Sequence, residues 1–174
     1  TDSAFDRWNA GDDDAMDAEQ VRGLEVFMGK GGCIICHSGP FFTDFAFHNM
    51  SREAVSPDGT RADEGRFLIT GVEADRGAFL TPTLRSVVMT SPFFHDGSEV
   101  NLRRVIAHIT GPDGKKDPLH SPILDGLSLL NDADTDALIS FLKALTGTMP
   151  SPARFNVPLE DLPSLDHAPV GAPL

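Results

Sequence analysis

The chain has 174 residues and a formal net charge of −12 at pH 7, with 14 Lys and Arg residues against 26 Asp and Glu residues. This length and composition suit one compact domain with its own core, and no apolar run is long enough to span a membrane. The negative charge argues against nucleic acid or an anionic membrane as a partner, and is explained either by solubility or by the attraction of a basic partner.

The first helix is predicted to follow an irregular beginning. Residues 1–16, which contain the acidic run 12–14, are expected to form a loosely ordered N-terminal segment. Asp17 and Gln20 make a pair like a capping box, so a helix should begin there. It should continue to Lys30 along an apolar stripe that consists of Val21, Leu24 and Val26-Phe27-Met28.

Residues 33–37, Cys33-Ile34-Ile35-Cys36-His37, form the C-x-x-C-H signature of covalent c-type haem. Each thiol adds across a vinyl group of the porphyrin, and His37 can then bind the iron as the proximal ligand. A redox dithiol needs no adjacent histidine, and a zinc site would need two further strong ligands at matching spacing. Because c-type haem is typically attached outside the cytoplasm, we expect a periplasmic or otherwise extracytoplasmic protein.

The segment from Ser38 to Thr81 follows neither the helical nor the strand period for long. It carries a cluster of aromatic residues: Phe41, Phe42, Phe45 and Phe47. A long irregular segment inside a compact domain needs something to pack on, and the faces of a porphyrin could replace side chains in that role. Ordinary core packing is the alternative for the phenylalanines.

Three further helices are predicted. Thr81-Pro82 is typical of an N-cap and first helical residue, opening a short helix to Val88. Ser98 should cap a helix over about residues 99–109, which Gly111-Pro112 ends. The last helix should run from Asn131 or Asp132 to Leu145, where Gly147 follows.

The predicted fold class is therefore mostly α: a c-type cytochrome domain with helices around one covalent haem and long irregular loops. Residues 17–147 form the haem domain in this division. Residues 148–174 form a Pro-rich C-terminal tail without periodicity.

Several stretches, taken in order, resemble the second haem domain of the bacterial di-haem cytochrome c peroxidases and the related MauG enzymes. The resemblance begins about residue 19 and ends at residue 147. Besides the haem motif with its continuation Ser38-Gly39-Pro40, it rests on residues 23–27, Phe42-Thr43-Asp44, Phe47-His48-Asn49, Asp63-Glu64-Gly65-Arg66, residues 77–85, residues 90–98 and residues 141–147.

The resemblance implies a two-domain enzyme of which this chain is one part. In that family two c-type haem domains pack around a calcium ion; one haem meets hydrogen peroxide, and the haem of the half seen here stores or relays electrons. A second C-x-x-C-H does not occur in this sequence. The chain is then either the second half of a longer protein, with the other haem domain upstream, or a single-haem relative.

Individual residues carry over from the resemblance. Cys33, Cys36 and His37 match the attachment residues and the proximal ligand. The backbone carbonyls of Thr90 and Pro92 match calcium-ligand positions between the domains, although the other ligands belong to the missing half. Arg85 matches an arginine of the haem environment and could pair with a propionate, with an ordinary surface arginine as the alternative.

The chain departs from the family at the sixth iron ligand. The family places Met or Tyr where this chain has Ile109, which cannot bind iron. His108 is the neighbouring candidate, but it lies about a hundred degrees around the helix. An open or water-bound iron is the other main alternative. Further candidates are Met50, Met89, His48 and His95.

Three functions follow from these observations. The first is an electron-transfer domain of a di-haem peroxidase-like oxidoreductase that serves peroxide reduction or a related oxidation; on its own the chain should be weak or inactive as an enzyme. The donor would be a small cytochrome or cupredoxin, basic in charge. The alternatives are a stand-alone mono-haem carrier and a haem-based module that binds a small ligand.

Overall fold

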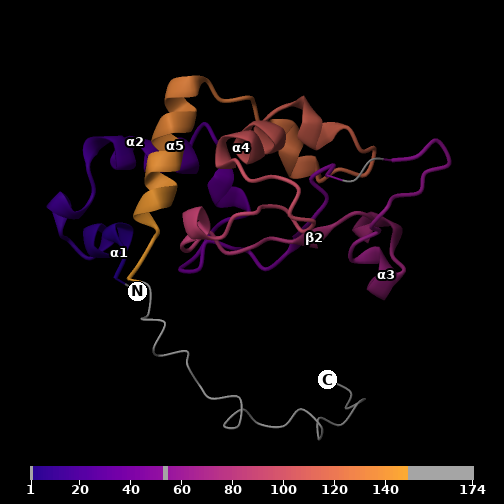
Figure 1. Ribbon diagram of the computed structural model, residues 1–174, viewed down its shortest axis with the longest axis horizontal. Helices are drawn as coiled ribbons and strands as arrows, with labels where there is room; N and C mark the ends of the chain where they lie inside the picture. The colour runs from indigo at the N-terminus through magenta and orange to yellow at the C-terminus, as the bar shows by residue number, and fades with distance from the viewer. Residues whose placement is uncertain (1, 53–54, 149–174) are drawn as a thin grey trace, which may run out of the picture.

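Helices α2 (Ala18–Met28) and α5 (Asp132–Ala144) cross at the centre of the computed structural model, which describes residues 2–52 and 55–148. Figure 1 shows α5 passing across α2. A Cβ atom added at Gly23 would lie 1.9 Å from the carbonyl oxygen of Ala137, so the two helices meet backbone against backbone at this glycine. The close crossing makes these two helices the frame on which the loops are arranged.

Both helices begin at the predicted residues because their caps are local. The Asp17 carboxylate accepts from the Gln20 N–H at 2.8 Å, and the Gln20 side chain accepts from the Asp17 N–H at 3.0 Å. At the start of α5 the Asn131 side chain accepts from the Asp134 N–H at 2.8 Å. Each cap satisfies backbone donors that have no partner inside the helix.

The N-terminal segment differs from the expectation for residues 1–16. It contains a further helix, α1 (Ala4–Asn9), which begins with a capping box between Ser3 and Asp6. The ring of Phe5 packs edge-on at 5.2 Å from the Phe42 ring and 5.8 Å from the Phe141 ring. A six-residue helix is too short to be stable alone, so α1 depends on this contact with the core.

The predicted helix from Thr81 to Val88 is wrong. Residues Phe79–Leu80 form strand β2, which pairs antiparallel with β1 (Phe47–His48). The Thr81 N–H donates to the Ala46 carbonyl at 2.9 Å and so extends the pairing beyond β2. The following residues reach helical geometry only in a 3₁₀ turn, Val87–Met89.

Helix α4 (Leu102–Thr110) starts later than predicted. Asn101, not Ser98, is its N-cap, and the Asn101 side chain accepts from the Arg103 N–H at 3.0 Å. The Ser98 hydroxyl instead donates to Asp96 at 2.6 Å, in a turn outside the helix. The predicted end is close to the observed one, because Gly111 follows Thr110 and Pro112 cannot continue the helix.

The rest of the described chain is mostly irregular, as predicted for residues 38–81. The short helix α3 (Phe67–Thr70) is the one named α-helix in that stretch. Further 3₁₀ turns span Asp13–Ala15, Cys33–Ile35, Glu73–Asp75, Pro112–Lys115 and Pro122–Gly126. The predicted tail lies outside the described residues apart from Thr148, whose N–H donates to Asp2 at 2.9 Å. No helix in the described ranges has the length and apolar character that crossing a membrane requires.

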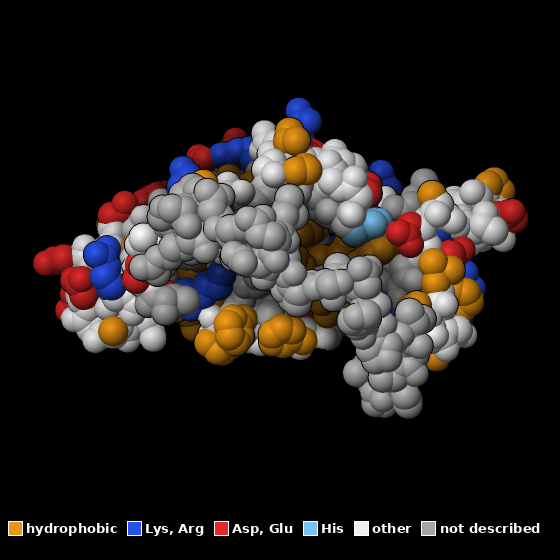
Figure 2. Space-filling model, turned by 60° about the horizontal axis from the view of Figure 1, so that its bottom comes forward, with side chains coloured by type: hydrophobic (Ala, Val, Ile, Leu, Met, Phe, Trp, Pro, Cys, Tyr) orange, Lys and Arg blue, Asp and Glu red, His pale blue; other side chains and the backbone are white. Residues whose placement is uncertain are grey.

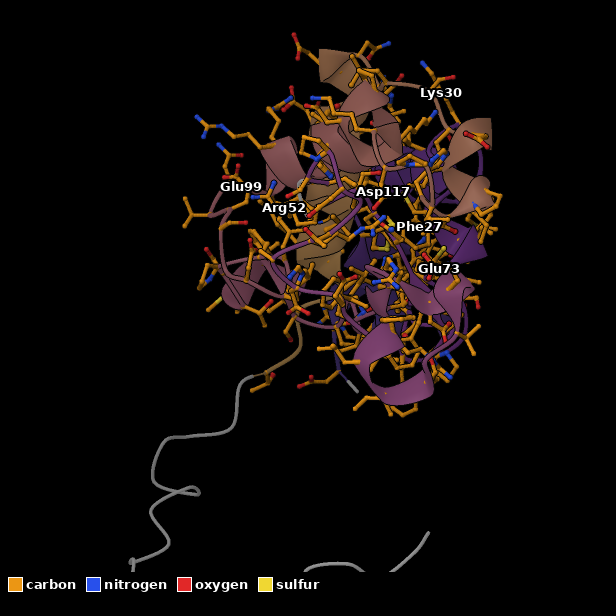
Figure 3. All side chains as sticks on the ribbon, turned by 90° about the vertical axis from the view of Figure 1, so that its right-hand side faces the viewer. Phe27, Lys30, Arg52, Glu73, Glu99 and Asp117 are labelled. Atoms are coloured by element: carbon orange, nitrogen blue, oxygen red, sulfur yellow. The ribbon has the colours of Figure 1, made fainter. Side chains whose placement is uncertain are left out.

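A buried ion pair ties the irregular loops together. Arg61 donates through Nε and Nη2 to the two carboxylate oxygens of Asp117, at 2.8 and 2.6 Å. The side chains are 3% and 1% exposed. Asn49 Nδ2 and the Leu119 N–H also donate to this carboxylate. In Figure 3 Asp117 lies toward the middle of the molecule, whereas Arg52 lies to one side.

Candidate haem attachment site

The C-x-x-C-H motif begins in a 3₁₀ turn, Cys33–Ile35, a short distance after the end of α2, and continues through Cys36 to His37. The Gly31 N–H donates to the Val26 carbonyl at 2.7 Å and ends the helix. Gly32 has φ 62°, a left-handed conformation that glycine adopts readily, and a Cβ there would lie 2.5 Å from the Leu127 side chain. The turn Cys33–Ile35 follows, and the His37 N–H donates to the Cys33 carbonyl at 2.9 Å. Both thiols and the imidazole are therefore presented by one compact turn.

The His37 imidazole is held in the form that a metal ligand needs. Its Nδ1 lies 2.9 Å from the carbonyl oxygen of Phe42, which can only accept, so Nδ1 carries the proton in the neutral ring and Nε2 keeps its lone pair. Burial lowers the pKa of His37, although hydrogen bonds to the Phe42 and Pro82 carbonyls and the charge of Asp44 oppose this. A backbone carbonyl that fixes the tautomer is the usual support of a metal-binding histidine.

The Phe42 backbone takes up an unusual conformation to supply that carbonyl. Its φ is 52°, in the left-handed region that bulky residues rarely occupy, while its ring is 5% exposed in the core. Phe45, three residues later, has φ 55° and is 65% exposed. Such conformations persist where surrounding structure holds them, and they gather at functional sites.

The two thiols do not have the character of a redox pair. Burial raises the pKa of Cys33 to about 12 and that of Cys36 to about 11. Both are free thiols, and both stay protonated at neutral pH. Reactive C-x-x-C dithiols work through a thiol with a lowered pKa, so this turn lacks what a dithiol oxidoreductase needs. Thioether attachment is compatible with neutral thiols, and the residues present fit a haem c.

Asp44 and His48 stand beside Cys36, and reasoning from the sequence missed the role of Asp44. The Asp44 N–H donates to the Cys36 carbonyl at 2.7 Å, and His48 Nε2 lies 2.9 Å from the Asp44 carboxylate. Ligand atoms of Cys36, Asp44 and His48 all lie within 4.8 Å of one another. Such a set could bind a divalent metal as a thiolate site, but a Cys36 sulfur in a thioether cannot serve both purposes.

Arg85 connects α1 to the loop that follows the motif. Its guanidinium pairs with the Asp6 carboxylate at 2.9 Å and donates through Nε to the Pro40 carbonyl at 2.9 Å. The same group lies 5.0 Å from the centre of the Phe42 ring. These contacts support the loop that holds His37, while pairing with a propionate stays a prediction.

Helix α4 carries the residues considered for the sixth ligand. Ile109 is half-buried, between the buried Ile106 and Thr110. His108 Nε2 lies 2.8 Å from the Met50 carbonyl oxygen, so this nitrogen carries a proton and is already in use. His48 is taken up by Asp44 and Ser121. Two statements therefore stay predictions: that Ile109 lies at the sixth position of the iron, and that His108 could bind there as a ligand.

The remaining residues considered from the sequence are the two calcium positions, Thr90 and Pro92, and two candidates for the sixth iron ligand, His95 and Met89. Thr90 and Pro92 lie on an exposed turn, and their role as calcium ligands stays a prediction. The ring of His95 stacks on Phe79 at 3.5 Å. Met89 is 62% exposed.

An apolar hollow of about 670 Å³ lies beside the motif turn, between α1, α2 and the loop of residues 39–42. Trp8, Leu24, Ile34 and Phe41 are in its wall. Figure 2 shows hydrophobic side chains exposed on one face of the molecule. Single exposed apolar side chains are normal on a protein surface, whereas large contiguous apolar patches often mark binding sites.

Comparison with curated sequences finds relatives over most of the chain. A cytochrome c peroxidase of Denitromonas iodatirespirans is 34% identical over 171 residues, which covers 84% of this chain and 45% of the relative. The methylamine utilization protein MauG of Methylorubrum extorquens is 37% identical over 155 residues, which covers 88% of this chain and 41% of the relative. The chain thus spans less than half the length of these two relatives.

Comparison with solved structures also finds a relative of the MauG type. The crystal structure of a MauG-like protein associated with microbial copper homeostasis matches with a TM-score of 0.76 and 28% identity, over 87% of this chain and 54% of that protein. No protein-family model matches the chain. On the strength of these sequence and structural matches, the chain belongs to the family of the di-haem cytochrome c peroxidases and MauG proteins, and the matched span is consistent with a C-terminal haem domain of that family.

Proposed function

We propose that this chain is an electron-transfer domain with one covalent haem c, and that it serves the peroxide or related oxidative chemistry of a di-haem oxidoreductase. The observation that carries the proposal is the motif turn: two half-buried, protonated thiols and an imidazole whose Nδ1 is fixed by the Phe42 carbonyl. Membership of the family supports the haem and the oxidoreductase class.

The chain's own residues would bind and orient the group. Cys33 and Cys36 form the thioethers and so fix the porphyrin edge to the turn, while His37 offers Nε2 to the iron. When bound, the haem supplies a one-electron couple, and the protein sets its potential through the axial ligand, burial and hydrogen bonds. Arg85 and Asp6 hold the loop of Pro40 and Phe42, which keeps the imidazole at a fixed angle.

The proposal is tested by the haem itself. Produced with a c-type maturation system, the chain should keep its colour through acid–acetone extraction, and Cys33→Ala, Cys36→Ala should lose it. His37→Ala should retain the thioethers but change the iron spectrum. His120→Ala is the matched control, because His120 is bound to Asp117 and Asp125 and should leave both readouts unchanged. Extraction of free haem from the native chain would contradict the proposal.

The peroxide-reacting site belongs, in this proposal, to a second haem domain upstream in the same polypeptide. Turnover of peroxide by the chain alone should accordingly be weak, since O–O cleavage needs a positioned acid–base group over an open haem face. A stand-alone carrier would show electron exchange with a donor and no dependence on any second domain. Calcium between the domains, bound through the Thr90 and Pro92 carbonyls, and an extracytoplasmic location are part of the same proposal.

A further inference from the structure

A carboxylate and an imidazole stand next to Cys36, and the haem attachment described above does not use them. Asp44 is held at several points: its N–H donates to the Cys36 carbonyl at 2.7 Å, and its carboxylate accepts from the Ala46 N–H at 2.9 Å. His48 Nε2 lies 2.9 Å from the other carboxylate oxygen. The carboxylate is thus fixed within 4.8 Å of the Cys36 sulfur rather than free to turn into solvent.

The other ring nitrogen of His48, Nδ1, connects the Asp44–His48 pair to a distant part of the chain. His48 Nδ1 lies 3.1 Å from the Ser121 hydroxyl, 73 positions along the sequence. The imidazole is about 15% exposed and the carboxylate about 20% exposed. His48 Nε2 faces the Asp44 carboxylate as a donor, and the Ser121 hydroxyl can act as donor or acceptor at Nδ1, so the two contacts fix the orientation of the imidazole beside the carboxylate.

The Asp44 charge persists at neutral pH. Burial alone would raise the pKa of Asp44, but hydrogen bonds from His48, the Ala46 N–H and the Thr81 side chain outweigh burial and lower it. A fixed negative charge in a partly dry environment interacts more strongly with a nearby charge than it would in water.

We propose that Asp44 is a positioning residue for the redox chemistry: its carboxylate, oriented by His48 and Ser121 against the Cys36 thioether, lowers the reduction potential of the haem. The inference rests on the proposed haem. Ferric haem carries one more positive charge than ferrous haem, so a negative group beside the attachment point favours the oxidised form. A purely structural Asp44, needed only as an acceptor for the Ala46 N–H, would leave the potential unchanged when its charge is removed.

The Asp44→Asn variant separates the two roles, because an amide keeps an acceptor for Ala46 and loses the charge. In potentiometric titration of the haem-loaded chain, we expect the equilibrium constant for reduction to rise roughly three- to tenfold, tenfold being about 59 mV for one electron. The matched control is Asp13→Asn, which removes one charge from the exposed turn Asp13–Ala15. It should change the constant by much less, and the ferric spectrum should be the same in both variants.

Equal shifts in the two variants, or no shift in Asp44→Asn, would overturn the inference. If Asp44→Asn carries no haem, Asp44→Ser takes its place with the same expected rise. Absence of haem in both would also overturn it, because the carboxylate would then serve attachment and not potential. Absence of covalent haem in the native chain is a different result, since it contradicts the proposed function itself.

Discussion

The two residues considered for the sixth iron ligand, His108 and Ile109, are neighbours on α4. His108 is held by the Met50 carbonyl and by edge-on packing against Phe94, with ring centres 5.3 Å apart. For His108 to bind iron through Nε2, the hydrogen bond to Met50 would have to break. Ile109 has no atom that can bind iron, and it occupies the position where relatives of this family, by sequence resemblance, carry the ligand.

Replacing Ile109→Met is expected to give a low-spin, six-coordinate iron with a raised potential, because a thioether sulfur raises haem potential. The change is followed by the ferric and ferrous absorption spectra and by potentiometric titration. In the native chain the iron should bind carbon monoxide readily when reduced, and the variant should bind it more slowly.

The companion variant is His108→Ala, which should leave the iron spectrum unchanged and cost about 1 kcal/mol of stability through the lost hydrogen bond. If the native iron is already low-spin and loses that spectrum in His108→Ala, then His108 is the ligand and the open-site prediction is wrong.

At the scale of elements, the crossing of α2 and α5 is set by one small residue and reinforced by charge. Gly23 brings the α2 backbone against Ala137 and Phe141 of α5. Near the start of α5, the Asp134 carboxylate pairs with Arg22, which lies 3.2 Å away, and with Lys30. Hydrogen bonds from Lys30 are the main reason that the pKa of Asp134 is lowered. Packing and charge therefore fix the same crossing.

Gly23→Ala should destabilise the domain by about 3 kcal/mol or more, because the added methyl group meets backbone atoms that cannot move without parting the helices. Chemical denaturation followed by far-UV circular dichroism measures the loss. Gly126→Ala is the control, since a Cβ there meets nothing within 4 Å, and it should change stability by less than about 0.5 kcal/mol. Equal stability of the two variants would show that the crossing is looser than described.

For the whole molecule, the irregular loops need a polar anchor because they have little regular structure. The pair of Arg61 and Asp117 supplies it, with Asn49 as a further donor to the carboxylate. Burial would raise the pKa of Asp117, but the hydrogen bonds from Arg61, Asn49 and the Leu119 N–H lower it overall. A carboxyl group whose folded-state pKa is lowered stabilises the fold above its ordinary pKa of about 3.9, and this contribution fades as the pH falls toward the folded-state value.

Asp117→Asn should accordingly cost about 3–5 kcal/mol near pH 7, since Arg61 would be left buried without its partner. The difference from the native chain should shrink as the pH falls below about 3.9. Thermal unfolding across the pH range measures both effects. Asp113→Asn, which removes an exposed carboxylate paired with Lys116, should change little at any pH. A native–variant difference that stays constant from pH 7 to pH 3 would contradict this account.

The net charge of −12 leads to an expectation about partners. If a basic donor protein is attracted by the overall field, its association rate with the haem-loaded chain should fall as ionic strength rises, because salt screens exposed charges beyond about 8–10 Å. Stopped-flow reduction at several salt concentrations measures this. A neutral donor of similar size is the control, and equal salt dependence for both would assign the charge to solubility alone.

The features that the sequence determined by itself depend on interactions between residues that are close together in the chain. The capping pair of Asp17 and Gln20 depends on residues within a few positions of one another and was predicted, and the last helix begins where Asn131 or Asp132 was predicted to start it. The resemblance to the di-haem peroxidases rested on the same short motifs. Local hydrogen bonds are encoded wherever the right residues stand at the right spacing.

The tertiary structure decided what depends on distant partners. Arg85 finds Asp6 from 79 positions away, and His48 finds Ser121 from 73, so neither spacing nor periodicity indicated them. The pairing of Phe47–His48 with Phe79–Leu80, which ends just before the segment wrongly predicted as a helix, arises in the same way, because its two strands are far apart in the sequence. The local preference of a short segment is weak compared with such long-range contacts. The position of the Asp44 carboxylate beside the Cys36 sulfur is likewise a result of the folded structure and was not predicted from the sequence.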